Sequence, residues 1–371
     1  MDTTDSSAPH LLNRTLDRPF LLSVIIPARN EALTLPACLA SLVSQSDFQF
    51  VLGKQWEIIV VDDESTDNTR ALAADFAAKH PDITVLESPK LELQATKRAF
   101  NGKTQACWTG FQASNPAAHW LLFTDADTVH ESGDLSRALF EAEKNKVALL
   151  SYSPRQVLTG AAQHLLMPLI FSELASTYPP KKVNDPAYRT AAANGQFLLV
   201  DRAAYVAVGG HRAIGTEILE DVELAQRIKR AKHSIRLRYA PDALSTHMYR
   251  GFSDMMEGWT KNLALLFGNP ILLATNRTLD FMLLLGLPVL LWDMPAIFGW
   301  HGLGRILLAL LWIRVLGRYY TRVARSHFPF LDVALSPLGL PLFVYLLLQS
   351  WLRHKIIRRV DWKGRSYRTG R

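Results

Sequence analysis

Four apolar runs that alternate with helical segments set the strongest constraint on how this chain folds. They are LLSVIIPARNE, WEIIVVDDESTDNT, ITVLES and WLLFTDAD, which begin at residues 21, 56, 83 and 120. Strands that alternate with helices form a parallel sheet, and ligands bind beyond the carboxyl ends of its strands. We therefore predict an α/β domain, in which Asn30 caps the first helix and residues 102–113 form a later one.

The chain changes character after about residue 249. Apolar residues make up 49% of the chain, and they are densest between Leu263 and Trp351. A length of 371 residues suits about two domains. We expect five segments: a flexible start (1–18), an α/β domain (19–250), an interfacial segment (251–277), transmembrane or interfacial helices (278–352) and a basic tail (353–371).

The positive charge is local. The last 19 residues hold eight Lys or Arg and one Asp, an excess equal to the net charge of the whole chain, +7. A basic segment directly after an apolar span suits anionic lipid and the cytoplasmic side of a membrane. We predict no nucleic-acid partner, because the rest of the chain is balanced in charge and carries no recognisable nucleic-acid motif.

The cysteines and the N-terminus favour the cytoplasm. Cys38 and Cys107 are the two cysteines, and neither belongs to a CxxC pair. The first 18 residues lack the cationic start and apolar middle of a secretory signal. The α/β domain is therefore expected on the cytoplasmic side.

Carboxylates follow two of the apolar runs. The second run ends in Asp62 and Asp63, and the fourth ends in Asp125 and Asp127. Aspartates also occur in plain turns, but the predicted sheet brings these four to one edge, where they repel each other without a cation. Carboxylate oxygens suit Mg²⁺ or Mn²⁺ holding a diphosphate, so a metal-bound nucleotide is the expected occupant.

Further polar residues lie in FNGKTQA and ILEDVEL. Lys103 is not part of a complete phosphate-binding loop, and it is either a point charge for a phosphate or ribose or a solvated lysine at a helix start. Glu220 and Asp221 open an amphipathic helix, where acids also serve as partners of the helix dipole. Residues 194–196, Asn-Gly-Gln, precede another predicted strand.

Seven motifs in order resemble a known family. SVIIPARNE, VVDDEST, GKTQA, FTDADT, NGQF, VGG and ILEDVEL, between about Phe20 and His247, are similar to family 2 glycosyltransferases of the GT-A fold. MYRGFSDMMEGWTKNLA and VDWKGRSYR resemble, more narrowly, membrane glycosyltransferases of carotenoid and hopanoid pathways, including those called diaponeurosporenoate glycosyltransferases.

The resemblance implies a fold and a nucleotide site. It implies the fold of nucleotide-diphospho-sugar transferases, a mostly parallel sheet with helices on both faces, followed here by a C-terminal helical membrane region. It places the nucleotide beside Pro27, Ala28, Asn30 and Glu31, with Asp62 or Asp63 at the uracil and ribose.

The resemblance also implies the catalytic residues. Asp125 and Asp127 correspond to the metal-binding DxD pair, and Asp221, next to Glu220, corresponds to the general base of an inverting transfer. His247 is similar to a third metal ligand, although a satisfied structural histidine is an equal alternative. The region MMEGWTKN lacks the Arg of the QxxRW box of polymerising members. This favours a single transfer, with Trp259 and Lys261 at the donor or at the membrane face.

Two segments are long and apolar enough to cross about 30 Å of hydrocarbon. They are Leu279–Trp300, interrupted by Asp293, and Leu331–Trp351. Between them, Ile306–Ile313 is short and flanked by arginines, which predicts a helix lying on the interface. Two spans keep both the α/β domain and the basic tail inside, with a re-entrant first segment as the alternative.

The sequence thus predicts a metal-dependent inverting glycosyltransferase of the inner membrane. It would move a sugar, from UDP-glucose or a similar donor, to a membrane lipid such as a carotenoid or other terpenoid. Two alternatives stay open: transfer to polyprenyl phosphate, for which Lys181, Lys182 and Arg189 are candidate contacts, and a non-catalytic nucleotide-sugar sensor.

Overall fold

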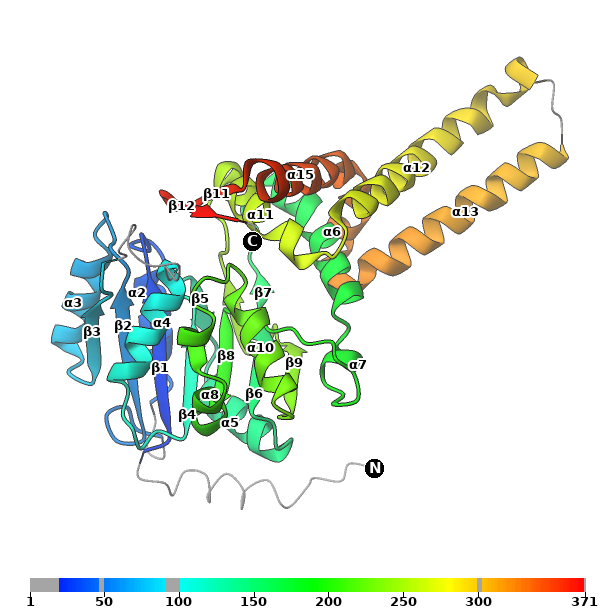
Figure 1. The fold of residues 1–371 in the computed structure, drawn as a ribbon. Helices are drawn as coiled ribbons and strands as arrows, with labels where there is room; N and C mark the ends of the chain where they lie inside the picture. Colours follow the sequence, from blue (N-terminus) through cyan, green and yellow to red (C-terminus); the bar gives the residue numbers. More distant parts are fainter. Residues whose placement is uncertain (1–19, 47–49, 91–100, 299–301, 370–371) are drawn as a thin grey trace. The chain divides into compact units, whose positions relative to one another are not determined.

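A computed structural model describes residues 20–46, 50–90, 101–298 and 302–369, and Figure 1 shows its ribbon. The chain divides into two compact units. The first unit contains Met1–Val157 and Pro180–Met248, and the second contains Leu158–Pro179 and Tyr249–Arg371. The start expected to be flexible, 1–18, lies outside the described residues.

The first unit is built on a seven-stranded sheet with the order β3-β2-β1-β4-β8-β6-β9. All neighbours pair in parallel except β8, which runs antiparallel to both β4 and β6. The prediction of a mostly parallel sheet is confirmed. The strands are β1 (Leu22–Ala28), β2 (Trp56–Asp62), β3 (Ile83–Glu87), β4 (Trp120–Thr124), β6 (Leu149–Ser153), β8 (Phe197–Asp201) and β9 (Ile235–Tyr239).

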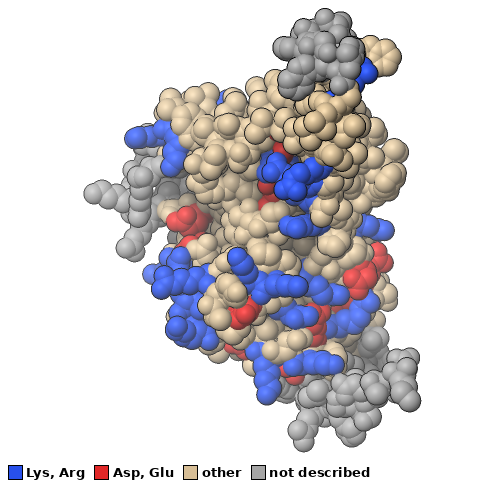
Figure 2. All heavy atoms as spheres, turned by 90° about the vertical axis from the view of Figure 1, so that its right-hand side faces the viewer, with Lys and Arg blue, Asp and Glu red and all other residues tan. Residues whose placement is uncertain are grey.

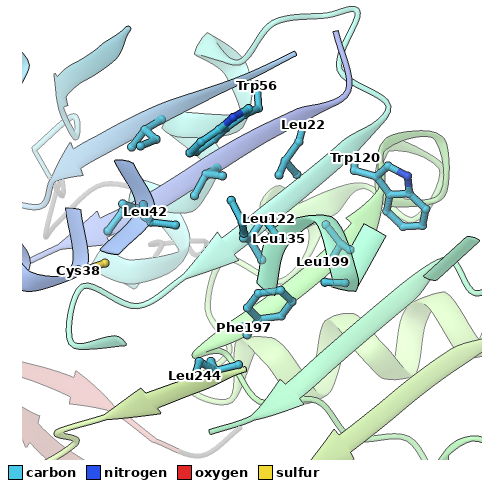
Figure 3. Packing of buried hydrophobic residues seen from close by; sticks show 14 of the residues in the cluster. Leu22, Cys38, Leu42, Trp56, Trp120, Leu122, Leu135, Phe197, Leu199 and Leu244 are labelled. Carbon is cyan, nitrogen blue, oxygen red and sulfur yellow. The ribbon is translucent and has the colours of Figure 1, made fainter. Parts of the chain in front are cut away.

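Helices complete the first unit, and the side chains of each strand alternate between its two faces. On one face Leu22 and Leu122 pack with Cys38 and Leu42 of the first helix, as the close-up in Figure 3 shows. On the other face Ile59 and Val61 pack with Ala106 of α4. The helices are α2 (Leu35–Val43), α3 (Thr69–Lys79), α4 (Gly102–Ala113), α5 (Asp134–Lys144), α7 (Pro180–Val183), α8 (Arg202–Ala207), α9 (Gly210–Ala213) and α10 (Glu220–Arg230).

The predicted cap at Asn30 is wrong. The first helix begins at Leu35, its N-cap position is Thr34, and no side chain caps it. Asn30 has a positive φ of 53° instead, and its side-chain oxygen accepts a hydrogen bond from the Thr66 amide at 2.8 Å. The sequence around Asn30 is compatible with a helix cap, but the hydrogen bond to Thr66, 36 residues later in the chain, fixes the conformation of Asn30 instead. This residue ties the loop after β1 to the loop after β2.

A small second sheet with the order β5-β10-β7 lies in the same unit. Its strands are β5 (Thr128–His130), β10 (Leu244–Thr246) and β7 (Arg155–Gln156). β5 and β10 are antiparallel, with Thr128 opposite Thr246. This register places Asp127 directly opposite His247, where the His247 amide donates to the Asp127 carbonyl oxygen at 3.4 Å.

The second unit is mainly helical and combines two separate parts of the chain. Its first part is α6 (Ala161–Thr177), which lies inside the range 19–250 that the sequence analysis assigned to one domain. The rest comprises α11 (Phe252–Leu266), α12 (Pro270–Phe298), α13 (Leu303–Val323), η1 (Ala324–Ser326), α14 (Phe330–Leu335), η2 (Ser336–Gly339), α15 (Leu340–Leu352), the π-helical turn η3 (Arg353–Ile357), β11 (Arg359–Trp362) and β12 (Arg365–Arg368).

The basic C-terminal segment is folded. β11 and β12 form an antiparallel hairpin in which Val360 is buried. The Lys363 amide donates to Glu257 of α11 at 2.9 Å, and the Lys261 ammonium lies 4.8 Å from the centre of the Trp362 ring. The hairpin therefore packs on α11 by hydrogen bonding and by a cation–π contact.

Two helical stretches of the described chain are long and apolar enough to cross a membrane. They are Pro270–Trp292 and Phe330–Ile357, and they overlap the two predicted spans. The end of the first predicted span, residues 299 and 300, lies outside the described residues. The segment Ile306–Ile313, predicted as an interfacial helix, belongs to the longer helix α13.

Helix α4 approaches the sheet closely at Gly110. A Cβ atom built there would lie 2.4 Å from Ile25 Cγ2 and 3.2 Å from Val61 Cγ2. We expect Gly110→Ala to lower the free energy of unfolding, because overpacking costs about 1 to 3 kcal/mol and the gain in helix propensity is about 1 kcal/mol. Chemical denaturation of the full chain in detergent measures the change.

The matched control is Gly317→Ala in α13, where an added Cβ would meet nothing within 4 Å. This substitution should leave stability unchanged or raise it slightly, because only the propensity gain applies. Equal effects of the two substitutions would show that the close approach at Gly110 is not a constraint.

Candidate active site

The antiparallel pairing of β4 and β8 assembles the centre of the site. Thr124, the last residue of β4, pairs with Phe197, the first residue of β8. Continuing this register brings Asp125 beside the Asn194-Gly195-Gln196 turn. The Thr124 hydroxyl donates to the Gln196 carbonyl oxygen at 2.8 Å. Two motifs that are 70 residues apart in the sequence therefore meet at the carboxyl end of β4.

Lys103 is held between two carboxylates. Its ammonium lies 2.7 Å from Asp125 Oδ1 and 2.9 Å from Glu220 Oε1. Burial by itself lowers the pKa of Lys103, but the two carboxylates outweigh it and hold that pKa well above its usual value. The solvated-lysine alternative does not describe this structure. Lys103 is a fixed positive charge between β4 and α10.

Hydrogen bonds at the start of α4 fix the position of Lys103. Asn101 caps the helix by accepting from the Thr104 amide at 2.9 Å. The backbone N–H of Asn101 and the Thr104 hydroxyl both donate to the Gly215 carbonyl oxygen, at 2.6 and 2.8 Å. Since Gly215 lies just before α10, the start of α4 is tied to the segment that carries Glu220.

Asp221 is held by two backbone amides. Gly195 N–H donates to its Oδ2 and Val222 N–H donates to its Oδ1, each at 2.8 Å. Burial, with a further contribution from the neighbouring Glu220, raises the pKa of Asp221 to about 6. A carboxylate with this pKa is ionised at neutral pH and still accepts a proton readily, which suits a general base.

These residues line one narrow pocket of the first unit. Its wall also includes Pro27 at the end of β1, Cys107 of α4 and the buried imidazole of His211. Pro27, Lys103, Asp125, Glu220 and Asp221 were all candidate site residues, so the structure brings five of them to a single cavity.

His211 is a pocket residue that the sequence analysis did not select. Its Nδ1 lies 2.9 Å from the Tyr205 hydroxyl, which also accepts the His211 backbone N–H at 3.0 Å. Burial lowers the pKa of His211 to about 4, so the ring is neutral at physiological pH. Gly210 permits this arrangement, because its φ is +52° and a Cβ there would lie 2.4 Å from the Tyr205 ring. The glycine pair before His211 was the available signal.

The remaining nucleotide candidates lie at the ends of β1 and β2. Ala28 pairs with Asp62 in the parallel register. Asp62 is buried, and its Oδ1 has no hydrogen-bond partner among the described residues. Glu31 accepts from the Thr34 hydroxyl at 2.7 Å, while Arg29 donates to the Asp63 carbonyl oxygen at 2.6 Å. This edge therefore presents a buried acceptor suited to a donor group of a ligand.

The metal candidates are partly assembled. Asp127, directly before β5, and His247, directly after β10, lie opposite each other when the strand register is continued, and such pairs have Cβ atoms about 5 Å apart. Asp125 is engaged by Lys103. In the described part of the chain, no three His, Cys, Asp or Glu side chains form a group arranged to hold a metal ion.

Trp259 belongs to the second unit. It is buried on α11, and its indole N–H donates to Met167 Sδ at 3.4 Å. Its ring also contacts Phe171 and Tyr249. These partners all belong to the second unit, and the predicted donor contact of Trp259 stays a prediction.

Comparison with known proteins identifies the class. Residues 23–205 match the family described as Glycosyl transferase family 2, a segment that contains β1, α4 and the Asp-x-Asp pair. The chain is therefore a glycosyltransferase with a family 2 domain, and the resemblance found in the sequence is confirmed.

Two relatives extend the match to nearly the whole chain. The 4,4'-diaponeurosporenoate glycosyltransferase of Staphylococcus haemolyticus (strain JCSC1435) is 27% identical over 370 residues, which cover 93% of this chain and 88% of the relative. The protein of the same name from Staphylococcus aureus (strain MRSA252) is 25% identical over 372 residues, with the same coverage.

A solved structure supports the fold. The mannosyltransferase PcManGT from Pyrobaculum calidifontis, solved in complex with GDP-Man and Mn²⁺, aligns with a TM-score of 0.50 and 16% identity over 94% of each chain. The GT-A fold expected from the motifs is confirmed.

The Lys103 contacts generate a stability prediction. Lys103→Met leaves the Asp125 and Glu220 carboxylates facing each other, and we expect a loss of about 2 kcal/mol. This is less than the roughly 3 to 5 kcal/mol lost when one partner of a fully buried pair is removed, because Lys103 is 35% exposed. The unfolding midpoint of the full chain in detergent measures the loss.

A second variant isolates the electrostatic part. In the Glu220→Gln background one of the two facing charges is gone, so Lys103→Met should cost clearly less than in the native chain. If the cost is the same in both backgrounds, the effect comes from lost packing and not from the two carboxylates.

Proposed function

We propose that this glycosyltransferase transfers a sugar, with inversion, from a nucleotide sugar of the UDP type to a lipid acceptor in the membrane. The observation that carries the proposal is Asp221, a carboxylate fixed by two backbone amides at a cavity that it shares with Lys103 and Asp125. A single base beside the donor site suits one direct displacement, in which the acceptor attacks as the nucleoside diphosphate leaves.

The donor would occupy the carboxyl edge of β1, β2 and β4. The buried Oδ1 of Asp62, which has no hydrogen-bond partner in the described part of the chain, would accept a hydrogen bond from the nucleoside. The other proposed nucleotide contacts are Pro27, Ala28, Asn30, Glu31 and Asp63. Lys103 would give one of its contacts to the diphosphate, which is a stronger anion than a single carboxylate. Glu220 keeps Lys103 in place and raises the pKa of Asp221.

A divalent metal, Mg²⁺ or Mn²⁺, fits one corner of this site. Asp127 and His247 offer a carboxylate and an imidazole from positions next to the ends of two paired strands, and Asp125 lies two residues from Asp127. Carboxylate oxygen is the ligand type preferred by these ions, and diphosphate oxygens would complete the shell. When bound, the metal would neutralise charge on the diphosphate.

The acceptor is proposed from the relatives and from the second unit. The named relatives are glycosyltransferases of diaponeurosporenoate, so a carotenoid or other terpenoid is the proposed acceptor class. Two helical stretches long and apolar enough to cross a membrane suit an enzyme that meets its acceptor in the lipid layer. We place the protein in the inner membrane with the first unit in the cytoplasm, where nucleotide sugars are available.

The first test is a transfer assay. Membranes containing the protein are incubated with labelled UDP-glucose, with Mn²⁺ or Mg²⁺ and with a total lipid extract. Metal-dependent label in a neutral lipid is expected, and Asp127→Ala should reduce it at least 100-fold. The control Asp75→Ala, an exposed carboxylate on α3, should leave it unchanged.

Other outcomes of this assay are equally informative. Label in an acid-labile phospholipid would replace the terpenoid with polyprenyl phosphate as acceptor. Absence of transfer with UDP-, GDP- and other nucleotide sugars would overturn the proposed reaction and favour the nucleotide-sugar sensor.

The raised pKa of Asp221 predicts the pH dependence. With a hydroxyl acceptor the base must be ionised, so kcat/KM should fall about tenfold per pH unit below pH 6. Asp221→Asn should be slow at every pH and should lack this acidic limb. Initial rates between pH 4.5 and 8 measure both.

With a carboxylic acid as the acceptor, the transfer rate should not fall as the pH is lowered through 6. This acceptor is already ionised there and needs no base, and protonating Asp221 removes a repulsion. A rate that holds or rises as the pH falls through 6, with little effect of Asp221→Asn, would therefore contradict the base role and indicate a carboxylate acceptor.

A further inference from the structure

Helices α12 and α13 form an antiparallel pair that is connected by a hydrogen bond and by ion pairs at different positions along its length. They lie side by side in Figure 1, and their far ends extend away from the other helices of the second unit. The Trp312 indole N–H of α13 donates to the Leu284 carbonyl oxygen of α12 at 3.1 Å. Closer to the rest of the unit, Arg318 and Arg322 of α13 contact Asp280 of α12 at 3.0 and 2.9 Å.

Charge is separated along this pair. The segment Ile306–Ile313 of α13 contains no polar side chain except the Trp312 indole, and it is followed by Arg314, Arg318 and Arg322. The charged end also contains Asp280, Arg277 and, from α6, Glu173, whose carboxylate lies 3.2 Å from Arg277 and 3.5 Å from Arg322. The pair is therefore ionic and anchored at one end. Beyond that end both helices are apolar as far as Trp292 of α12 and Ile306 of α13, and Asp293 and Arg305 follow past these positions.

The apolar half is exposed around both helices. On α13 the exposed side chains are Leu303, Ile306, Leu307, Leu310, Leu311 and Ile313. On α12 they include Met282, Val289 and Trp292, the last with 85% exposure. Figure 2 shows a surface of mostly uncharged residues over the upper part of the view, with a patch of charged side chains set within it. A helix lying on a membrane surface needs a polar face, and this half of α13 has none.

The backbone supports a water-free environment. Pro288 has no N–H, so the Leu284 carbonyl oxygen, four residues earlier, loses its helical hydrogen-bond donor. The Trp312 indole supplies the missing donor from the neighbouring helix. In water this carbonyl would be solvated without help, whereas in hydrocarbon an unsatisfied carbonyl is costly and a neighbouring helix must satisfy it.

We propose that α12 and α13 enter the hydrocarbon layer of a membrane together, as a helical hairpin, while their arginine end stays at the level of the lipid headgroups. The proposal rests on the membrane location in the proposed function and is independent of the transfer chemistry. It changes one part of the predicted arrangement, in which Leu279–Trp300 and Leu331–Trp351 cross the membrane and residues 306–313 lie on the interface. Arg314 and Arg318, both exposed, would face anionic headgroups.

Arg305 limits how the tip is placed. It lies in the first turn of α13 and is exposed. The run Ile306–Ile313 is about 12 Å long, well under the roughly 30 Å of hydrocarbon, and long arginine side chains extend away from an apolar segment to reach polar surroundings. The proposal therefore concerns the immersion of residues 306–313 beside α12 and not a complete crossing by α13.

Depth-dependent quenching tests the proposal directly. The native Cys38 and Cys107 are fully buried, so single added cysteines can be labelled with an environment-sensitive fluorophore. Leu310→Cys and Val289→Cys report on the apolar half of each helix, and the exposed Ala324→Cys is the matched control at the charged end. The full chain is reconstituted in phosphatidylcholine vesicles with and without phosphatidylglycerol.

Nitroxide lipids labelled deep in the acyl chain should quench positions 289 and 310 at least twofold more than lipids labelled at the headgroup. Position 324 should show the reverse order and should be open to aqueous iodide. If headgroup-labelled lipids quench position 310 and chain-labelled lipids quench position 289, residues 306–313 lie on the membrane surface, as predicted from the sequence. If iodide quenches positions 289 and 310, both lie in water. If neither iodide nor the nitroxide lipids quench them, a second copy of the protein covers them. Either result would overturn immersion in the membrane.

A double-mutant cycle tests the carbonyl argument. Trp312→Phe should lower the unfolding midpoint in lipid bicelles by several degrees, and the control Trp292→Phe should not. Pro288→Ala restores the backbone N–H of residue 288, which can donate to the Leu284 carbonyl oxygen, so in that background the loss from Trp312→Phe should shrink at least twofold. An unchanged loss would show that the carbonyl does not depend on the indole and would remove this support for a water-free hairpin.

The two proposals fail separately. Transfer activity is measured on the same vesicles, so a chain that inserts its hairpin without transferring sugar would contradict the proposed function alone. A chain that transfers sugar with position 310 in water would contradict the hairpin alone.

Discussion

Two carboxylates from distant parts of the chain can lie close together in the first unit because one ammonium group lies between them. Lys103 contacts Asp125, at the end of β4, and Glu220, at the start of α10. Its backbone is fixed by the Asn101 cap and by the shared contacts to Gly215. The backbone amides of Gly195 and Val222 hold Asp221 at the same cavity. The site therefore has its anion-binding ammonium in place before any ligand arrives, and an incoming diphosphate exchanges one anion for another at Lys103.

The reversed strand β8 provides the second constraint. If β8 ran parallel like its neighbours, the Asn194-Gly195-Gln196 turn would lie at the opposite edge of the sheet. Running antiparallel, β8 starts where β4 ends, and Gly195 reaches the Asp221 carboxylate. A Cβ at this position would lie 3.1 Å from the Lys103 ammonium, so the absence of a side chain also leaves the cavity open.

The parts that could be predicted from sequence are those set by local pattern. Strands β1 to β4 are apolar runs, and α4 has the predicted bounds, 102–113. Contacts between distant residues were not predictable in this way. Asn30 is a residue type common at helix caps, but it binds Thr66. His211 is held in the pocket wall by Tyr205, a contact that local pattern does not reveal. The basic tail packs on α11 through Glu257 and Lys261. Similarly, nothing in the sequence of α6 reveals that Arg277 and Arg322 surround Glu173.

The division of the second unit between two stretches of sequence affects the order in which the protein can fold during synthesis. Helix α6 leaves the ribosome about one hundred residues before Arg277, and the first unit is interrupted by it. Until the later helices emerge, α6 has no partner for its apolar side chains or for Glu173. Nascent chains of this length therefore hold an unpaired apolar helix between two halves of a sheet, the kind of exposed surface that attracts chaperones or the insertion machinery. The interleaved sequence thus makes completion of the second unit depend on helices that are translated long after α6.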